Sequence, residues 1–158
     1  MVTAESRAPV TVPLQLRWAD TDVYGHVNNV TYARYLEEAR IRAFGLPDHP
    51  MTAPPDQPPI FACLEPKTFT MTVAQRLEYV NELAYHGQTI LADLWLSRIG
   101  SSSLDIGCRL YHQVSALTYL WAQVTLVVCD LTSRRPRPLS VAETRALAPY
   151  LGEPVSFR

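Results

Sequence analysis

The sequence has almost no lysine and no excess of charge of either sign. Its 14 basic residues, all arginine except Lys67, nearly balance 15 acidic residues and leave a net charge of −1. A domain dedicated to nucleic acid usually carries a strong basic excess, because it must neutralise backbone phosphates. We therefore expect no nucleic-acid partner, although a small anionic ligand would need only a local group of arginines.

Cysteines are few, and long apolar runs are missing. The three cysteines, Cys63, Cys108 and Cys129, form no CxxC pair and leave one over. This pattern favours buried free thiols in a reducing compartment. No apolar run approaches the ~18 to 20 residues that cross a bilayer, and the first ten residues lack the apolar core of a signal peptide. These absences predict a cytoplasmic protein with no membrane partner.

The chain does contain enough apolar sequence for one core. Its 158 residues suit one compact domain, and 47% hydrophobic with 18% charged residues argues against global disorder. We expect residues 1–158 to form a single domain, with 1–10 as a frayed N-terminus. Six of the 13 prolines fall within residues 46–59. That segment is predicted to be a loop or lid, because proline fixes φ and removes a backbone donor.

The clearest predicted element is a helix over residues 29–44. Apolar residues recur there at helical spacing, whereas Arg40 and the other charged residues fall on the opposite side. Asn28 or Asn29 suits the N-cap, and Gly45 marks the end of the helix.

Alternation of apolar and polar residues predicts strands elsewhere in the chain. The first, at 12–19, places Leu14, Leu16 and Trp18 on its buried side. Further strands are expected at 60–64, 69–80, 88–99, 103–113 and 118–130, and a short amphipathic helix at 141–148. One long helix followed by hairpin-connected strands indicates an α+β domain, with an antiparallel sheet packed against the helix.

The residues best suited to chemistry lie between the first predicted strand and the long helix. This stretch reads Asp20-Thr21-Asp22-Val23-Tyr24-Gly25-His26-Val27-Asn28-Asn29. The unpaired N–H groups of a helix N-terminus can polarise a carbonyl oxygen, and a carboxylate upstream can act as nucleophile or general base. The histidine adds a group that titrates near neutrality. The two aspartates also suit a structural role, in which they accept backbone N–H groups in a turn.

The run from Leu16 to Tyr32 contains the pattern D-x-Y-x-H-V-N-N-x-x-Y and continues into Tyr35-Leu36-Glu37-Glu38-Ala39-Arg40. It resembles the signature of the 4-hydroxybenzoyl-CoA thioesterase family, and more closely that of its bacterial acyl-CoA thioesterases. A looser match extends over 69–139. The resemblance implies a hot-dog fold, an antiparallel sheet wrapped around the long helix, that works as a homodimer or homotetramer. It also implies hydrolysis of an acyl-CoA substrate to free acid and CoA, with no cofactor and no metal.

The same resemblance assigns roles within the motif. Asp22 matches the catalytic carboxylate, as nucleophile or as the base that activates water, and the amide near Asn29 matches the group that polarises the thioester carbonyl. His26 matches a motif position with either a catalytic or a loop-shaping role, and Tyr24 and Asn28 are expected to line the substrate. A thioester suits so modest an apparatus, because its thiolate leaving group has a pKa near the ~8.5 of cysteine and needs no strong acid.

The candidates for binding CoA itself are the arginines of Arg134-Arg135-Pro136-Arg137, after the last predicted strand. Arg135 and Arg137 match positions that hold nucleotide phosphates in some family members, and planar guanidinium groups suit phosphate oxygens. A solvated basic turn is the alternative interpretation. Asp20 is expected to orient the loop.

Three other functions stay open. A hot-dog hydratase or dehydratase acting on acyl thioesters would pair its Asp and His at a different spacing. A non-catalytic acyl-CoA-binding regulator would be expected to carry an added domain. A metal site built from Asp20, Asp22 and His26 would match no familiar ligand spacing.

Overall fold

The computed structural model describes residues 7–47 and 59–158, whose five strands form one antiparallel sheet. They are β1 (Val10–Gln15), β2 (Thr68–Tyr79), β3 (Thr89–Ile99), β4 (Ser103–His112) and β5 (Thr118–Asp130). The spatial order is β1-β3-β4-β5-β2, so β1 and β2 form the edges. The predicted proline-rich loop at 46–59 falls almost entirely outside the described residues, as do positions 1–6 of the N-terminus that was expected to be frayed.

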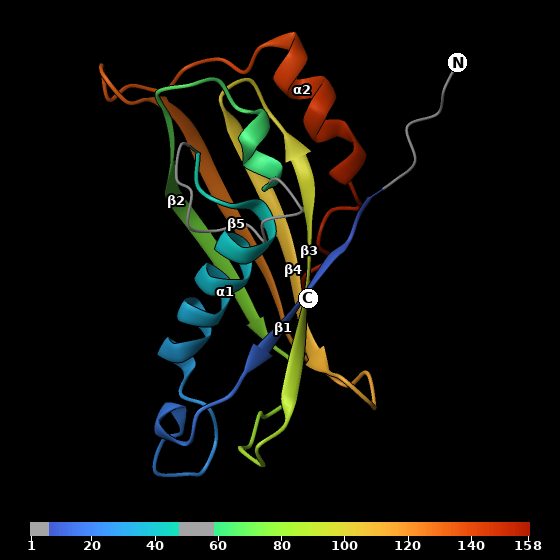
Figure 1. Cartoon of the computed structure of the whole chain (residues 1–158). Helices are drawn as coiled ribbons and strands as arrows, with labels where there is room; N and C mark the ends of the chain where they lie inside the picture. The colour runs from blue at the N-terminus through green and yellow to red at the C-terminus, as the bar shows by residue number, and fades with distance from the viewer. Residues whose placement is uncertain (1–6, 48–58) are drawn as a thin grey trace.

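Helix α1 (Asn29–Phe44) has the predicted bounds and lies across one face of the sheet (Figure 1). Asn28 caps it, because its side-chain oxygen accepts the Val30 N–H at 3.0 Å. Gly45 ends it with a φ of 78°, a conformation that favours glycine. No helix within the described ranges is long and apolar enough to cross a membrane.

The core lies between α1 and the sheet. On the helix-facing side of the central strands, Leu94, Ile106 and Leu126 are buried completely or almost so, and Leu36 and Phe44 of α1 pack toward them. Complete burial of one such side chain contributes roughly 2 kcal/mol relative to exposure. A one-residue slip of a strand would turn its buried residues to solvent, so this core fixes the register and with it the ends of the strands.

The predictions for the first strand and for residues 60–64 are wrong. The first strand ends at Gln15, and Trp18 lies in a 3₁₀ turn (Trp18–Asp20) with 75% of its surface exposed. Where a strand was predicted at 60–64, Ile60–Cys63 form a 3₁₀ helix. A single turn is enough to bring Phe61 into the core, where the centroid of its ring lies 5.1 Å from that of Phe44.

Arg40, predicted on the solvent side of α1, is buried. Its side chain lines a narrow cavity of about 160 Å³ between α1 and β2, together with Thr72 and Gln75. Burial lowers the pKa of its guanidinium. The helical spacing could not reveal this, because the sheet extends past the apolar face of the helix. Cys108 and Cys129 are buried free thiols, as predicted, and Cys63 is a partly buried one.

Candidate functional site

The loop between β1 and α1 is a tight turn held by its own backbone. Thr21 and Val27 pair as an antiparallel bridge. Inside this bridge, the Asp22 N–H donates to the His26 carbonyl at 2.8 Å and the Gly25 N–H donates to the Asp22 carbonyl at 3.0 Å. Gly25 has a φ of 76°, which a residue with a Cβ adopts only with strain. The local sequence therefore fixes the position of Asp22.

The two oxygens of the Asp22 carboxylate have different surroundings. Oδ1 accepts the Tyr24 N–H at 2.9 Å and the His26 N–H at 3.4 Å, which are the contacts of an Asx turn. Oδ2 accepts no hydrogen bond from any residue that the structure describes. The hydrogen bonds of Oδ1 thus hold the carboxylate in place without occupying Oδ2.

Asp22 borders a cavity of about 310 Å³ at the N-terminal end of α1. His26 and Asn29 line it from the loop and the helix start, Tyr32 from α1 and Tyr79 from the end of β2. The Asn29 N–H is the first of the helix and has no hydrogen-bond partner among the described residues. Asp22 and the first residue of the helix therefore line one cavity.

Glu82 joins the site from the segment after β2, which carries no sequence motif. Its Oε2 lies 3.3 Å from His26 Nε2, with 79% of the glutamate side chain and 36% of the histidine exposed. The segment reaches the loop because Val27 donates its N–H to the Leu83 carbonyl at 2.8 Å and His26 bridges to Ala84. A single glutamate in a connecting segment carries no local sequence signal that could have marked Glu82 as part of the site. In the parts of the chain described, no three His, Cys, Asp or Glu side chains gather in a way that could hold a metal ion.

Tyr24 and Asn28 serve the loop rather than the cavity within one chain. Tyr24 is 80% exposed and does not line the cavity. Its one contact with a lining residue is the hydrogen bond from its N–H to Asp22. The Asn28 side chain is occupied by its cap, and its N–H donates to the Asp20 carbonyl at 2.9 Å. Their expected contacts with substrate stay predictions.

The arginines after β5 lie at the opposite end of the sheet from Asp22 (Figure 1). Leu120, near the start of β5, pairs with Tyr79 beside the cavity, whereas Asp130 pairs with Thr68 and leads into the arginine turn. At ~3.3 Å per residue, β5 separates the two ends by roughly 30 Å. One chain therefore does not bring Arg135 or Arg137 to the cavity.

Arg137 is engaged inside the protein. Its Nη2 donates at 2.6 Å both to Glu143 Oε1 and to Thr68 Oγ1. Burial alone would raise the pKa of the Glu143 carboxyl, but hydrogen bonds from Arg137 and from the N–H groups of Ser140 and Glu65 hold it at about 2. Arg137 thus ties the start of helix α2 (Val141–Leu147) to the start of β2. This geometry supports a structural role, not a phosphate contact.

Arg135 and Arg134 differ from Arg137. The Arg135 side chain is exposed and contacts no partner among the described residues. The guanidinium of Arg134 lies over the ring of Phe69, 4.4 Å from its centroid. Of the two arginines matched to phosphate positions, Arg135 alone is therefore available to a ligand in this conformation.

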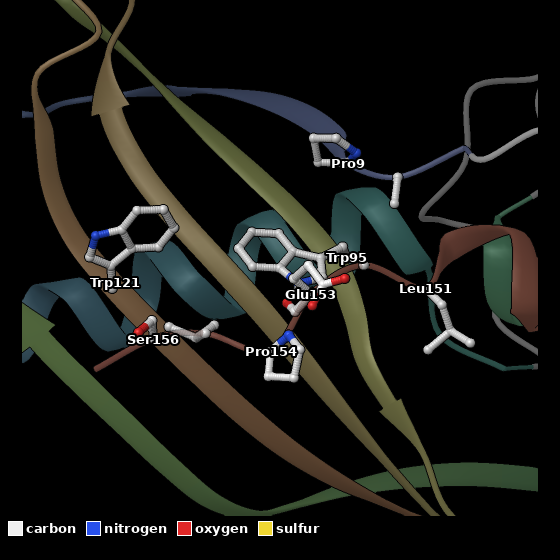
Figure 2. A pocket seen from close by; sticks show the side chains of 10 residues that line it. Pro9, Trp95, Trp121, Leu151, Glu153, Pro154 and Ser156 are labelled. Atoms are coloured by element: carbon white, nitrogen blue, oxygen red, sulfur yellow. Dashed lines mark hydrogen bonds between the residues drawn. The ribbon is translucent and has the colours of Figure 1, made fainter. Parts of the chain in front are cut away.

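A larger cavity of about 460 Å³ lies on the face of the sheet away from α1 (Figure 2). Trp95 and Trp121 dominate it, and the Trp95 Nε1–H donates to the Glu153 carbonyl at 2.7 Å. Gly107 and Gly152 press on the Trp95 indole so closely that a Cβ on either would lie within 2.7 Å of it. This cavity is mostly apolar, and although Glu153 and Ser156 line it, it borders no helix N-terminus in the described residues that could polarise a carbonyl oxygen. The Asp22 cavity is the candidate active site.

The chain is similar in sequence and in fold to known proteins. Residues 16–147 match the model of the Thioesterase-like superfamily. A putative acyl-CoA thioesterase from Xanthomonas campestris is 32% identical over 77% of this chain and 92% of its own, with a TM-score of 0.59. A predicted thioesterase from Bacillus stearothermophilus has a TM-score of 0.75 at 23% identity, over 94% of this chain and all of its own. A 1,4-dihydroxy-2-naphthoyl-CoA thioesterase from Synechocystis has a TM-score of 0.66 at 16% identity, over 89% and 96% of the two chains. No curated protein matches the sequence.

Proposed function

This chain belongs to the thioesterase-like superfamily, and on that premise we propose that it hydrolyses an acyl-CoA to the free acid and CoA. Membership makes it a thioester hydrolase with an α+β hot-dog fold. The narrower likeness to 4-hydroxybenzoyl-CoA thioesterases stays a resemblance. One observation carries the proposal: Asp22 and Asn29 line the same cavity, and neither Asp22 Oδ2 nor the Asn29 N–H has a hydrogen-bond partner among the described residues.

The proposed chemistry begins when the thioester carbonyl oxygen accepts the Asn29 N–H. The positive end of the helix dipole supports the negative charge that develops there, and one such donor is typically worth about 3 kcal/mol in the transition state. Asp22 Oδ2 then attacks the carbonyl carbon itself or takes a proton from the water that attacks. In either case the thiolate of CoA leaves without an acid. If Asp22 has attacked, water then hydrolyses the Asp22–acyl anhydride, which releases the free acid and restores the carboxylate.

His26 and Glu82 form the outer wall of this site. Their contact and the bridge from His26 to Ala84 hold His26 against the segment after β2. We propose that His26 shapes the cavity and contacts the substrate there, with Glu82 fixing its ring. For Tyr24 and Asn28, in the loop between β1 and α1, we retain the proposed role of lining the substrate.

The site is proposed to be complete only in a homodimer. One edge of β2 pairs with β5 and the other is free among the described residues, and Met71 and Val73 are about half exposed on this strand. An exposed edge of twelve residues is a ready template for a second chain. Antiparallel pairing of two β2 strands about a two-fold axis would set the partner's arginine turn beside the Asp22 cavity. Arg135 of the partner subunit would then reach the CoA phosphates.

Turnover of a panel of acyl-CoAs tests the proposed function. Short-chain, long-chain, enoyl and aromatic acyl-CoAs are offered to the purified protein, and free thiol and free acid are measured together. We expect equal release of both from at least one substrate. Hydration of an enoyl-CoA without thiol release would indicate a hydratase, and tight binding without any product would indicate a binding protein.

A further inference from the structure

Two tyrosines outside the Asp22 loop hold its two ends. Tyr35, on α1, donates its hydroxyl to Asp20 Oδ2 at 2.6 Å, and Tyr79, the last residue of β2, donates its hydroxyl to the Asn29 carbonyl at 3.2 Å. We propose that these two hydroxyls are positioning groups, which fix Asp22 relative to the Asn29 N–H. The inference rests on the proposed catalytic role of Asp22.

Asp20 joins the anchor at the first end to the rest of the loop. The oxygen that accepts the Tyr35 hydroxyl also accepts the Arg17 N–H at 3.2 Å, and the Asp20 carbonyl accepts the N–H of the cap residue Asn28. Through its carboxylate and its backbone carbonyl, Asp20 therefore connects the 3₁₀ turn before the loop, the buried face of the helix and the cap after the loop. A shift of Asp20 would move both flanks of Asp22.

Tyr35 is a reliable donor for this contact. Its side chain is 5% exposed, in the core beneath the loop. Burial, and then the hydrogen bond to Asp20, raises the pKa of its hydroxyl far above the ordinary value. The hydroxyl is consequently protonated at neutral pH and can donate this hydrogen bond.

Tyr79, at the end of strand β2, holds the second end of the loop, at Asn29. Its ring stands edge-on to Tyr32 at 5.2 Å, and Tyr32 stands edge-on to Tyr35 at 6.3 Å, so the three rings form a continuous row beneath the loop. Its hydroxyl bonds to the same residue whose N–H is proposed to polarise the substrate. The row thus sets the distance between the carboxylate and the polarising amide by packing of rigid rings.

Loss of a hydroxyl from this row should affect turnover more than substrate binding. A misplacement of about 1 Å between reacting groups can lower a rate by roughly 100-fold. Removal of the Tyr35 hydroxyl leaves the ring, and hence the packing, in place. The expected signature is therefore a lower kcat with an unchanged KM, which a merely structural contact would not produce.

The test compares three Tyr→Phe variants in the thiol-release assay. Tyr35→Phe is expected to lower kcat by about tenfold and to leave KM within twofold, and Tyr79→Phe is expected to act in the same direction. Tyr111→Phe is the matched control, because the Tyr111 hydroxyl also donates to an aspartate, Asp93, at 3.2 Å but on the opposite face of the sheet. A kcat for Tyr35→Phe within twofold of the Tyr111→Phe value overturns the proposal.

A double-mutant cycle shows whether Tyr35 acts through Asp20. Asp20→Asn keeps the volume of the side chain and serves as the second measurement if Tyr35→Phe does not fold. The double variant should be no slower than the slower single variant, whereas fully additive losses overturn the inference. If Asp22→Asn leaves turnover intact, the proposed active site fails. If Asp22→Asn abolishes turnover and both tyrosine variants retain it, the positioning role alone fails.

Discussion

At the scale of single residues, Asp22 combines a contact that holds the loop with the catalytic role that we propose for it. An aspartate in a loop usually satisfies backbone amides, and Oδ1 of Asp22 does so with two of them. Because these bonds use one oxygen, they orient the other without occupying it. The turn around Gly25 therefore fixes the orientation of the Asp22 carboxylate in the absence of substrate.

Arg135 and Arg137 give the residue-scale prediction. Arg135→Ala should raise KM for acyl-CoA several-fold and leave Tm unchanged, because this exposed side chain is proposed to bind phosphate. Arg137→Ala should lower Tm by several degrees, because it leaves the Glu143 carboxylate, 1% exposed, without its cation. Steady-state kinetics and thermal melts distinguish the two. An Arg135→Ala enzyme with unchanged KM would remove this arginine from the CoA site.

At this scale, the sequence could predict contacts between residues that are close along the chain, but not contacts that depend on the folded chain. Asp22, His26 and Asn29 lie within a few positions of one another, and their local turn brings them to one cavity. Glu82 and Tyr79 join them only through strand pairing and a long connection. The pairing of Arg137 with Glu143 and Thr68 depends equally on the folded chain. A basic cluster in the sequence does not show which of its members is already neutralised.

At the scale of elements, α1 was predictable to the residue because three independent signals agree on it. Its apolar spacing, the cap at Asn28 and the stop at Gly45 all define the same segment. The short apolar run at 60–64 offered no such agreement, because a run of that length fits a strand or a turn equally well. Arg40 was misplaced because the width of the sheet facing α1 is not encoded in the helix itself.

The attachment of α2 to β2 gives a pH prediction at this scale. The folded-state pKa of Glu143, about 2, lies below its ordinary value of 4.5. The stability that this carboxylate contributes is therefore fully present above about pH 4.5 and is lost as the pH falls toward 2. Glu143→Gln should destabilise the protein by roughly 3 kcal/mol at pH 7, and the difference from wild type should shrink across that window.

Denaturant unfolding at several pH values measures this effect. Glu38→Gln is the control, because Glu38 forms an exposed pair with Arg42 at 3.3 Å on the surface of α1. Such pairs contribute about 0.5 kcal/mol or less, so the control should follow wild type throughout. A constant difference between Glu143→Gln and wild type from pH 7 down to pH 2 would contradict the assigned pKa.

At the scale of the whole molecule, the roughly 30 Å between Asp22 and the arginine turn is the feature that one chain does not resolve. Pairing of two β2 edges would resolve it, because antiparallel strands place opposite ends side by side. We expect sedimentation of the purified protein at micromolar concentration to show a dimer or a larger even assembly. A monomer that hydrolyses acyl-CoA at full rate would contradict the proposed arrangement.

The most direct test of the account is the turnover of Asp22→Asn on an acyl-CoA that the wild-type enzyme hydrolyses. Asp93→Asn is the control, because Asp93 also accepts two side-chain hydrogen bonds, from Thr11 at 2.7 Å and Tyr111 at 3.2 Å, on the far face of the sheet. We predict that thiol release falls by about 100-fold or more in Asp22→Asn and stays within twofold of wild type in Asp93→Asn, with both variants folded. Turnover of Asp22→Asn within a few-fold of wild type on every substrate would contradict the central role given to this carboxylate.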